Sequence, residues 1–292
     1  MSSFVLLAQV VSGGLVMGGL YAMVAMGLSL IYGVTRVLNF AHGTFVALAG
    51  IAGSILFSSL GIHPAWSILL AAAVFFVLGF GFYDLLLKPV MKYDHFKMTI
   101  GTVLITIGAF MIIEDLASVA AGPVQRNILL PSTVIAATGG IVTSIQLYVL
   151  LGITAVTLAL HAFLKHSWFG RAIRALTQDQ FAATAFGVQS ELIRGATFAV
   201  GTAMAGVSGV LYAMTLPVDL HTGFILTVKA FTVIAIGGIG NLTGTLVASV
   251  LLGVTEALVA FYVSSEWAPA VSIVVLLVVL VLAPRTDFVT HR

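Results

Sequence analysis

The sequence predicts an all-α, polytopic membrane protein with about eight or nine transmembrane or partly re-entrant helices. Sixty per cent of its 292 residues are hydrophobic and 8% are charged, whereas soluble domains average roughly 45–50% apolar and about 25% charged residues. The apolar residues also form long runs, and a bilayer core takes about 20 such residues per helix. These observations leave almost no room for a soluble domain, so we expect one transmembrane domain over residues 1–292.

The first apolar run, residues 4–30, carries no charge and is followed by Arg36. It lacks the basic start and the cleavage site of a signal peptide, so we expect a retained first helix. Pro64 and Pro269 open two later runs, where the missing amide hydrogen costs least. The later runs are 39–59, 64–87, 99–119, 146–164, 195–217, 223–240, 242–263 and 269–283. The run 223–240 is short, contains Lys229 and ends in glycines, so it is either a full span or a re-entrant or broken one.

Glycine and cysteine contents limit the chemistry of the chain. The 30 glycines suit helix packing within a membrane, where small residues allow close backbone approach. The chain has no cysteine, which excludes disulfides and cysteine metal sites, and we expect no metal site. The net charge of +2 gives no indication of a nucleic-acid partner.

The distribution of Lys and Arg predicts the orientation, because basic loops stay in the cytoplasm. Basic residues gather in the loop 88–97, in the polar segment 165–194 and at the carboxyl end, as Lys88, Lys92, Lys97, Lys165, Arg171, Arg174, Arg194, Arg285 and Arg292. Nine spans with these regions inside also put Arg36 inside, the amino terminus outside and the carboxyl terminus in the cytoplasm. Arg126 is then the one basic residue in an outer loop.

The polar segment 165–194 is unusual in so apolar a chain. Asp179, Ala183 and Gly187 are spaced four residues apart, which predicts a small helix with a smooth face. A carboxylate near the start of that helix is favoured by the helix dipole. Taken alone, the segment fits a solvated amphipathic loop better than a docking helix.

Several motifs resemble the branched-chain amino acid (Liv-type) ABC transporter permease family, and the LivH-like subunit within it. They cover most of the chain in matching order: residues 18–23 (GGLYAM), 27–34 (GLSLIYGV), 36–43 (RVLNFAHG), 170–175 (GRAIRA), 179–187, and 229–244 with its glycines. Thr44 stands where the family usually has an acidic residue, which puts a carboxylate role there in doubt.

The resemblance implies two sets of functional residues. Arg171, Arg174, Asp179, Ala183 and Gly187 would couple the cytoplasmic segment to an ATPase. The candidate translocation pathway comprises Tyr21, Asn39, His42, Lys229, Gly237 and Gly238.

The resemblance also implies partners in a bacterial inner membrane. These are a second, LivM-like permease, two cytoplasmic ATPase subunits that bind ATP and Mg, and a periplasmic solute-binding protein. The chain contains no Gly-x-x-x-x-Gly-Lys-Ser/Thr phosphate cradle, so we expect a transporter subunit that is not an enzyme and holds no cofactor itself. The outer loop 120–145, with Arg126 and Pro131, either receives the binding protein or is a plain linker.

The roles of several polar residues inside the apolar runs stay open at this point. Asn39 and His42 either line a cavity or cap a helix end. Lys229 either lines the pathway or snorkels to the membrane surface. Glu256 lies mid-run and needs a partner, a proton or a subunit contact. The glycine-rich turn 237–244 predicts close packing or backbone exposed to a solute, and Glu114 and Asp115 are expected in solvent.

Three alternative functions compete with import of branched-chain or other apolar amino acids. Relatives of the same family carry urea, short amides or aromatic acids. The run Gly206-Val207-Ser208-Gly209 is of the sort used by intramembrane proteases, but the later histidines, His221 and His291, fall in predicted loops. A stand-alone secondary carrier needs buried carboxylates, and only Glu256 qualifies.

Overall fold

The computed structural model describes residues 3–122, 124–135 and 141–282, and this part of the chain is helical. Its elements are α1 (Ser3–Thr35), α2 (His42–Leu60), α3 (Pro64–Phe82), a π-helical turn η1 (Tyr83–Leu87), a 3₁₀ turn η2 (Val90–Lys92), α4 (His95–Ala121), α5 (Ser144–His166), α6 (Trp168–Gln178), α7 (Gln180–Ala185), α8 (Ser190–Ala213), α9 (Leu220–Gly237), α10 (Leu242–Tyr262) and α11 (Ala268–Leu282). Extended pairing among these residues is limited to two isolated bridges. The all-α prediction is confirmed.

Eight of the described helices are long and apolar enough to cross a membrane. They are α1, α2, α3 with η1, α4, α5, α8, α9 and α10, and α11 adds a shorter apolar helix. The segment around Lys229 forms the unbroken helix α9, so a broken helix is not observed there. The chain is therefore a multi-pass membrane protein, as predicted.

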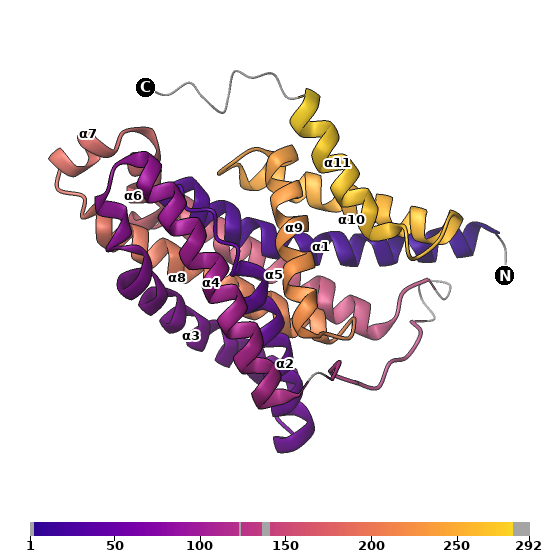
Figure 1. The fold of residues 1–292 in the computed structure, drawn as a ribbon. Helices are drawn as coiled ribbons and strands as arrows, with labels where there is room; N and C mark the ends of the chain where they lie inside the picture. Colours follow the sequence, from indigo (N-terminus) through magenta and orange to yellow (C-terminus); the bar gives the residue numbers. More distant parts are fainter. Residues whose placement is uncertain (1–2, 123, 136–140, 283–292) are drawn as a thin grey trace.

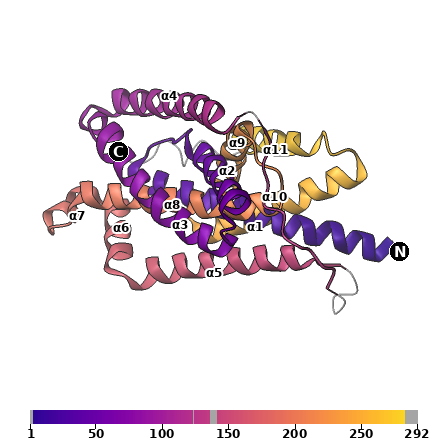
Figure 2. The same cartoon turned by 90° about the horizontal axis from the view of Figure 1, so that it is seen from below.

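Helices α1 and α8 form the centre of the bundle. The most apolar stretches of α1 and α8 are 89% and 78% buried, compared with 11% and 17% in α4 and α5. Figure 2 shows α4 and α5 on opposite sides of the molecule, with α1 and α8 between them. The side chains that α4 and α5 expose include Leu104, Ile112, Leu151 and Leu158, which suits contact with lipid.

Glycine brings the central helices into backbone contact. A Cβ atom added to Gly18 of α1 would lie 2.7 Å from the Cα of Val250 in α10. A Cβ on Gly43 of α2 would overlap the carbonyl oxygen of Gly223 in α9. The high glycine content therefore serves close helix packing, as the composition predicted.

The two ends of the bundle differ in charge. Figure 1 shows α6 and α7 at the end opposite the start of α1. We call the end with α6 and α7 the inner end, because it carries Arg36, Lys88 and Lys165, the residues predicted to face the cytoplasm. Arg285 and Arg292, which also supported that prediction, lie outside the described residues.

The opposite, outer end is held together by the loop that precedes α5. Arg126 and Val218 exchange backbone hydrogen bonds of 2.9 and 2.8 Å, and Gln125 donates to Asp219 at 3.2 Å. Burial raises the pKa of Asp219, but hydrogen bonds from Thr222 outweigh this effect and hold it below its usual value. The ionised carboxylate caps the start of α9.

Candidate functional site

The polar segment 165–194 folds into two short helices at the inner end. Ser167 caps α6, and Asp179 caps α7 by accepting a hydrogen bond from the Ala182 amide at 3.0 Å. Gly187 has a φ of 85°, a left-handed conformation that favours glycine, and follows the end of α7. The chain thus makes two sharp turns around a six-residue helix.

The predicted smooth face of α7 is not a single exposed surface, and this expectation needs correction. Ala183 is 5% exposed and packs against the chain's own core, while Gly187 lies beyond the last helical residue, Ala185. A six-residue helix is too short to carry three positions spaced four apart. The large apolar side chains that α7 and its end expose are Phe181 and Phe186, at 86% and 91%. Two phenylalanines in a polar segment were the signal that the sequence reasoning missed.

Helix α7 is tied to its neighbours by Arg194 at the start of α8. Its guanidinium donates to Gln180 Oε1 of α7 at 2.6 Å and to Glu191 Oε1 at 3.2 Å. Glu191 Oε2 in turn accepts a hydrogen bond from Tyr83 of η1 at 3.2 Å. These hydrogen bonds connect α7 with α8, the second most buried helix, and with the end of the third span.

Arg171 and Arg174 of α6 also bond within the chain. Arg171 donates to the His166 carbonyl at 3.2 Å, and Arg174 donates to the Leu164 carbonyl at 2.7 Å. Both satisfy carbonyls at the end of α5 that lack a helical partner. These bonds fix the corner between α5 and α6.

A hollow of about 580 Å³ lies beside α7, between η1 and the start of α8. Tyr83, Lys88, Gly187 and Glu191 are among the residues that line it. The hydrogen bond and charge of Asp84 raise the pKa of Lys88, which stays protonated. The inner surface next to Phe181 and Phe186 is therefore indented and charged.

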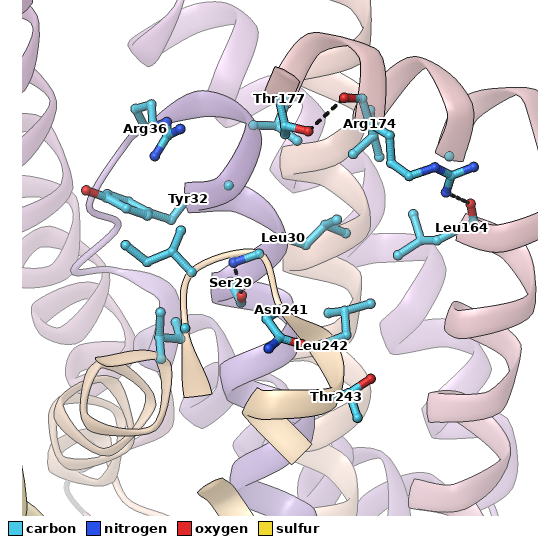
Figure 3. Close-up of a pocket in the computed structure, with 18 of the residues that line it drawn as sticks. Ser29, Leu30, Tyr32, Arg36, Leu164, Arg174, Thr177, Asn241, Leu242 and Thr243 are labelled. Carbon is cyan, nitrogen blue, oxygen red and sulfur yellow. Dashed lines mark hydrogen bonds between the residues drawn. The ribbon is translucent and has the colours of Figure 1, made fainter. Parts of the chain in front are cut away.

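A larger cavity of about 1120 Å³ opens at the inner end, and we call it the inner cavity. Figure 3 shows it between the end of α1 with Tyr32 and Arg36, the α9–α10 turn with Asn241, and α6 with Arg174. Ser29 Oγ accepts a hydrogen bond from the Gly240 amide at 3.0 Å, which joins α1 to the α9–α10 turn.

The two glycines predicted in the pathway have different surroundings. Gly238 lines the inner cavity and has a φ of 87°. Gly237 is packed, because an added Cβ would lie 2.5 Å from the carbonyl carbon of Gly244. Asn241 then caps α10 by accepting from the Gly244 amide at 3.0 Å. Close packing and exposed backbone thus both occur in this turn.

A buried ionic network joins four helices. Lys229 Nζ of α9 lies 2.7 Å from Glu256 Oε2 of α10, and Tyr21 of α1 donates to the same oxygen at 2.8 Å. Ser272 of α11 donates to Glu256 Oε1 at 3.1 Å. Lys229 and Glu256 are 8% and 5% exposed, so Lys229 does not snorkel, and neither Lys229 nor Tyr21 lines the inner cavity.

Asn39 lies in the turn between α1 and α2, His42 begins α2, and both residues are fully buried. Asn39 Oδ1 accepts from the Ala41 amide at 3.1 Å, and His42 Nε2 lies 3.1 Å from the Val24 carbonyl oxygen. These bonds support the structural alternative, and neither residue lines the inner cavity. Asn39 Nδ2, His42 Nδ1 and Thr44 Oγ1 nevertheless have no hydrogen-bond partner within the described structure. A pathway role for Asn39 and His42 therefore stays a prediction.

Two further expectations are settled by geometry. Ser208 is fully buried and donates to the Ala205 carbonyl at 2.9 Å, which leaves the protease alternative without a paired nucleophile in the described structure.

His221 lies in the first turn of α9 and contacts Glu114 at 3.0 Å. Glu114 is only 18% exposed, so its predicted place in solvent was wrong, whereas Asp115 is exposed.

Comparison with known proteins agrees with this architecture. Residues 10–283 match the family described as branched-chain amino acid transport system / permease component. The high-affinity branched-chain amino acid transport system permease protein LivH of Salmonella typhimurium is 28% identical over 298 residues, which cover 96% of this chain and 95% of that protein. The corresponding protein BraD of Pseudomonas aeruginosa is 28% identical, with 94% of both chains covered.

A solved structure shares the fold. A chain of PsaBC from Streptococcus pneumoniae, in complex with Fab, superposes with a TM-score of 0.50 over 94% of this chain and 92% of that chain. Sequence identity there is 14%, so the likeness concerns the fold alone.

Proposed function

The chain belongs to the branched-chain amino acid transport permease family, and we propose that it is the membrane-spanning subunit of a binding-protein-dependent ABC importer. Branched-chain or other apolar amino acids are the cargo, as the names of the relatives suggest. ATP is hydrolysed on separate subunits. The protein resides in the inner membrane with its carboxyl terminus in the cytoplasm.

One observation carries this proposal beyond the family match. Helix α7 projects at the inner end with two almost fully exposed aromatic side chains, Phe181 and Phe186, beside an indented surface. Aromatic side chains with this exposure are typical anchors at protein interfaces. An ATPase subunit docked there completes an importer whose energy source lies outside this chain.

Three further partners complete the proposed transport system. A second ATPase and a homologous, LivM-like permease give the pseudo-symmetric membrane assembly. A periplasmic solute-binding protein delivers the amino acid at the outer end, where the loop 124–135 is held against α2 and α9 through Ser54 and Asp219.

The coupling step is a transfer of movement through α7. Closure of the ATPase pair on ATP shifts α7, and Arg194 conveys that shift to α8 and through Glu191 to η1. Such switching needs docking contacts that differ between the two states of the permease. The unpartnered atoms of Asn39, His42 and Thr44 find partners in the other state, where this turn faces the passing amino acid.

Substitution of Gly187 tests the coupling role. Gly187→Val should allow ATP hydrolysis but lower uptake at least ten-fold in proteoliposomes with the partner subunits, because a β-branched residue disfavours the left-handed backbone. Gly187→Asn is the matched control, since asparagine tolerates that conformation, and it should keep most uptake. Unchanged uptake in Gly187→Val would show that the coupling assignment is wrong.

A further inference from the structure

The inner cavity carries positive charge that the described structure does not neutralise. Arg36, Lys165 and Arg174 line it, together with His161, and none of its described lining residues is a carboxylate. Four basic residues elsewhere pair with carboxylates, in Lys88–Asp84, Lys97–Asp94, Arg194–Glu191 and Lys229–Glu256. The side chains of Arg36 and Lys165 have neither an ion pair nor a hydrogen bond to any described residue, so this charge is free to attract an anion.

Arg36 is held at the edge of this cavity in a strained backbone conformation. Its φ of 57° is positive, and among the described residues every other positive φ belongs to a glycine. A left-handed conformation costs a residue with a side chain roughly 1–2 kcal/mol. Strain of this kind gathers at functional positions, because the surroundings must enforce it. The presence of an arginine in this strained conformation indicates that a guanidinium at the end of α1 has a function.

Below the cationic rim the cavity wall is apolar. Leu30 and Val34 of α1, Ile173 of α6, and Phe231 and Ile234 of α9 form much of it. The volume of about 1120 Å³ exceeds the roughly 300–1,000 Å³ typical of sites for drug-sized molecules. The shape and chemistry therefore suit an amphipathic anion larger than an amino acid. An amino acid is zwitterionic, and its ammonium group would meet no carboxylate among the described lining residues.

We infer that the inner cavity binds an anionic phospholipid, with its phosphate between Arg36, Lys165 and Arg174 and an acyl chain along the apolar wall. The inner end is the predicted cytoplasmic side, where anionic lipids give the leaflet a negative surface potential. Arginine is well suited to phosphate because its guanidinium binds two oxygens in parallel. Figure 3 shows Arg36 of α1 and Arg174 of α6 on opposite sides of the cavity, so a lipid bound in it lies between α1 and α6. The lipid thereby steadies the helix that leads into α7.

Lipid binding to the purified full-length protein tests the inference. Native mass spectrometry would compare phosphatidylglycerol with phosphatidylcholine of the same chain length, and inorganic phosphate would be added as a soluble competitor. We expect preferential binding of phosphatidylglycerol that inorganic phosphate does not displace. Arg36→Gln/Lys165→Gln should weaken this binding by about ten-fold or more, since each basic residue near a membrane surface contributes about 1 kcal/mol. Arg174 is kept in this variant because it also caps α5.

Two controls separate a specific site from general surface charge and from misfolding. Lys92→Gln removes a charge from the same predicted side but outside the cavity, and it should leave binding unchanged. Arg36→Lys/Lys165→Arg keeps both charges and exchanges one guanidinium for another, so it should retain most of the binding that Arg36→Gln/Lys165→Gln loses. The proposal would be overturned if the protein bound phosphatidylglycerol and phosphatidylcholine equally. It would also be overturned if Lys92→Gln lost as much phosphatidylglycerol binding as Arg36→Gln/Lys165→Gln, or if the charge-conserving variant lost that binding. Displacement by inorganic phosphate would overturn it too, because the ligand would then be a soluble anion.

Discussion

Lys229 and Glu256 form an ion pair in the part of the protein where isolated charges are least tolerated. Their 2.7 Å contact, the hydroxyl of Tyr21 and the hydroxyl of Ser272 satisfy both groups within the bundle. The sequence predicted that Glu256 needs a partner, a proton or a subunit contact, because an isolated charge amid apolar residues is costly. It could not identify Tyr21, which lies 235 residues away and meets Glu256 only through helix packing.

Breaking this pair on one side should destabilise the protein strongly. Lys229→Met leaves Glu256 unpaired and should cost about 3–5 kcal/mol, measured as a lower thermal midpoint in detergent. Lys229→Met/Glu256→Gln removes both charges and should recover most of that loss. Lys97→Met breaks an exposed pair with Asp94 and should change stability by less than about 1 kcal/mol. A midpoint of Lys229→Met equal to that of Lys97→Met would show that the buried pair has no structural role.

At the scale of single helices, the apolar runs predicted most of the spans. The predicted run 64–87 coincides with α3 and η1, and 242–263 with α10 to within one residue. The first helix extends to Thr35, five residues beyond the predicted end, because α1 stays buried up to Arg36 in the bundle. The predicted small helix with Asp179 at its start is confirmed as α7, but its smooth face was misread, since the sequence spacing did not reveal where so short a helix stops. Capping by Asp179 and termination before Gly187 are properties of the local backbone rather than of apolar periodicity.

The close contact between α2 and α9 should require glycine at position 43, where a side chain as small as a methyl group does not fit. Gly43→Ala places a Cβ against Gly223 and Thr227, and we expect a loss of at least 1–3 kcal/mol from overpacking. Gly108→Ala in α4 is the matched control, because an added Cβ there meets no atom within 4 Å. It should be neutral or stabilising by about 0.5–1 kcal/mol. Thermal unfolding of both variants checks the prediction, and equal midpoints would contradict the close packing of α2 on α9.

For the molecule as a whole, the number of spans followed from composition, whereas their arrangement did not. Amphipathicity is weak in helices that meet lipid on one side and apolar neighbours on the other. The sequence therefore could not show that α1 and α8 are central, or that α4 and α5 lie at the periphery. The inner cavity likewise arises where α1, α6 and the α9–α10 turn meet, far apart in sequence. Motif resemblance identified the family, and it predicted a coupling role for residues 165–194, without revealing this geometry.

The predicted orientation is directly testable because the chain contains no cysteine. Leu129→Cys lies in the outer loop and is exposed, and Gln178→Cys lies at the exposed end of α6. A membrane-impermeant maleimide applied to spheroplasts should label Leu129→Cys at once and Gln178→Cys only after permeabilisation. The reverse pattern would place α6 and α7 outside the cell and exclude a cytoplasmic ATPase as their partner.

The central claim is that α7 couples ATP hydrolysis to amino acid import through Phe181 and Phe186. Its most direct test is the ratio of leucine imported to ATP hydrolysed in proteoliposomes that contain the partner subunits. Phe181→Ser/Phe186→Ser should lower that ratio at least ten-fold with normal membrane insertion. Phe96→Ser, an equally polar change at a 72% exposed phenylalanine near the predicted inner surface, should leave it unchanged. A wild-type ratio in the double variant would contradict the claim.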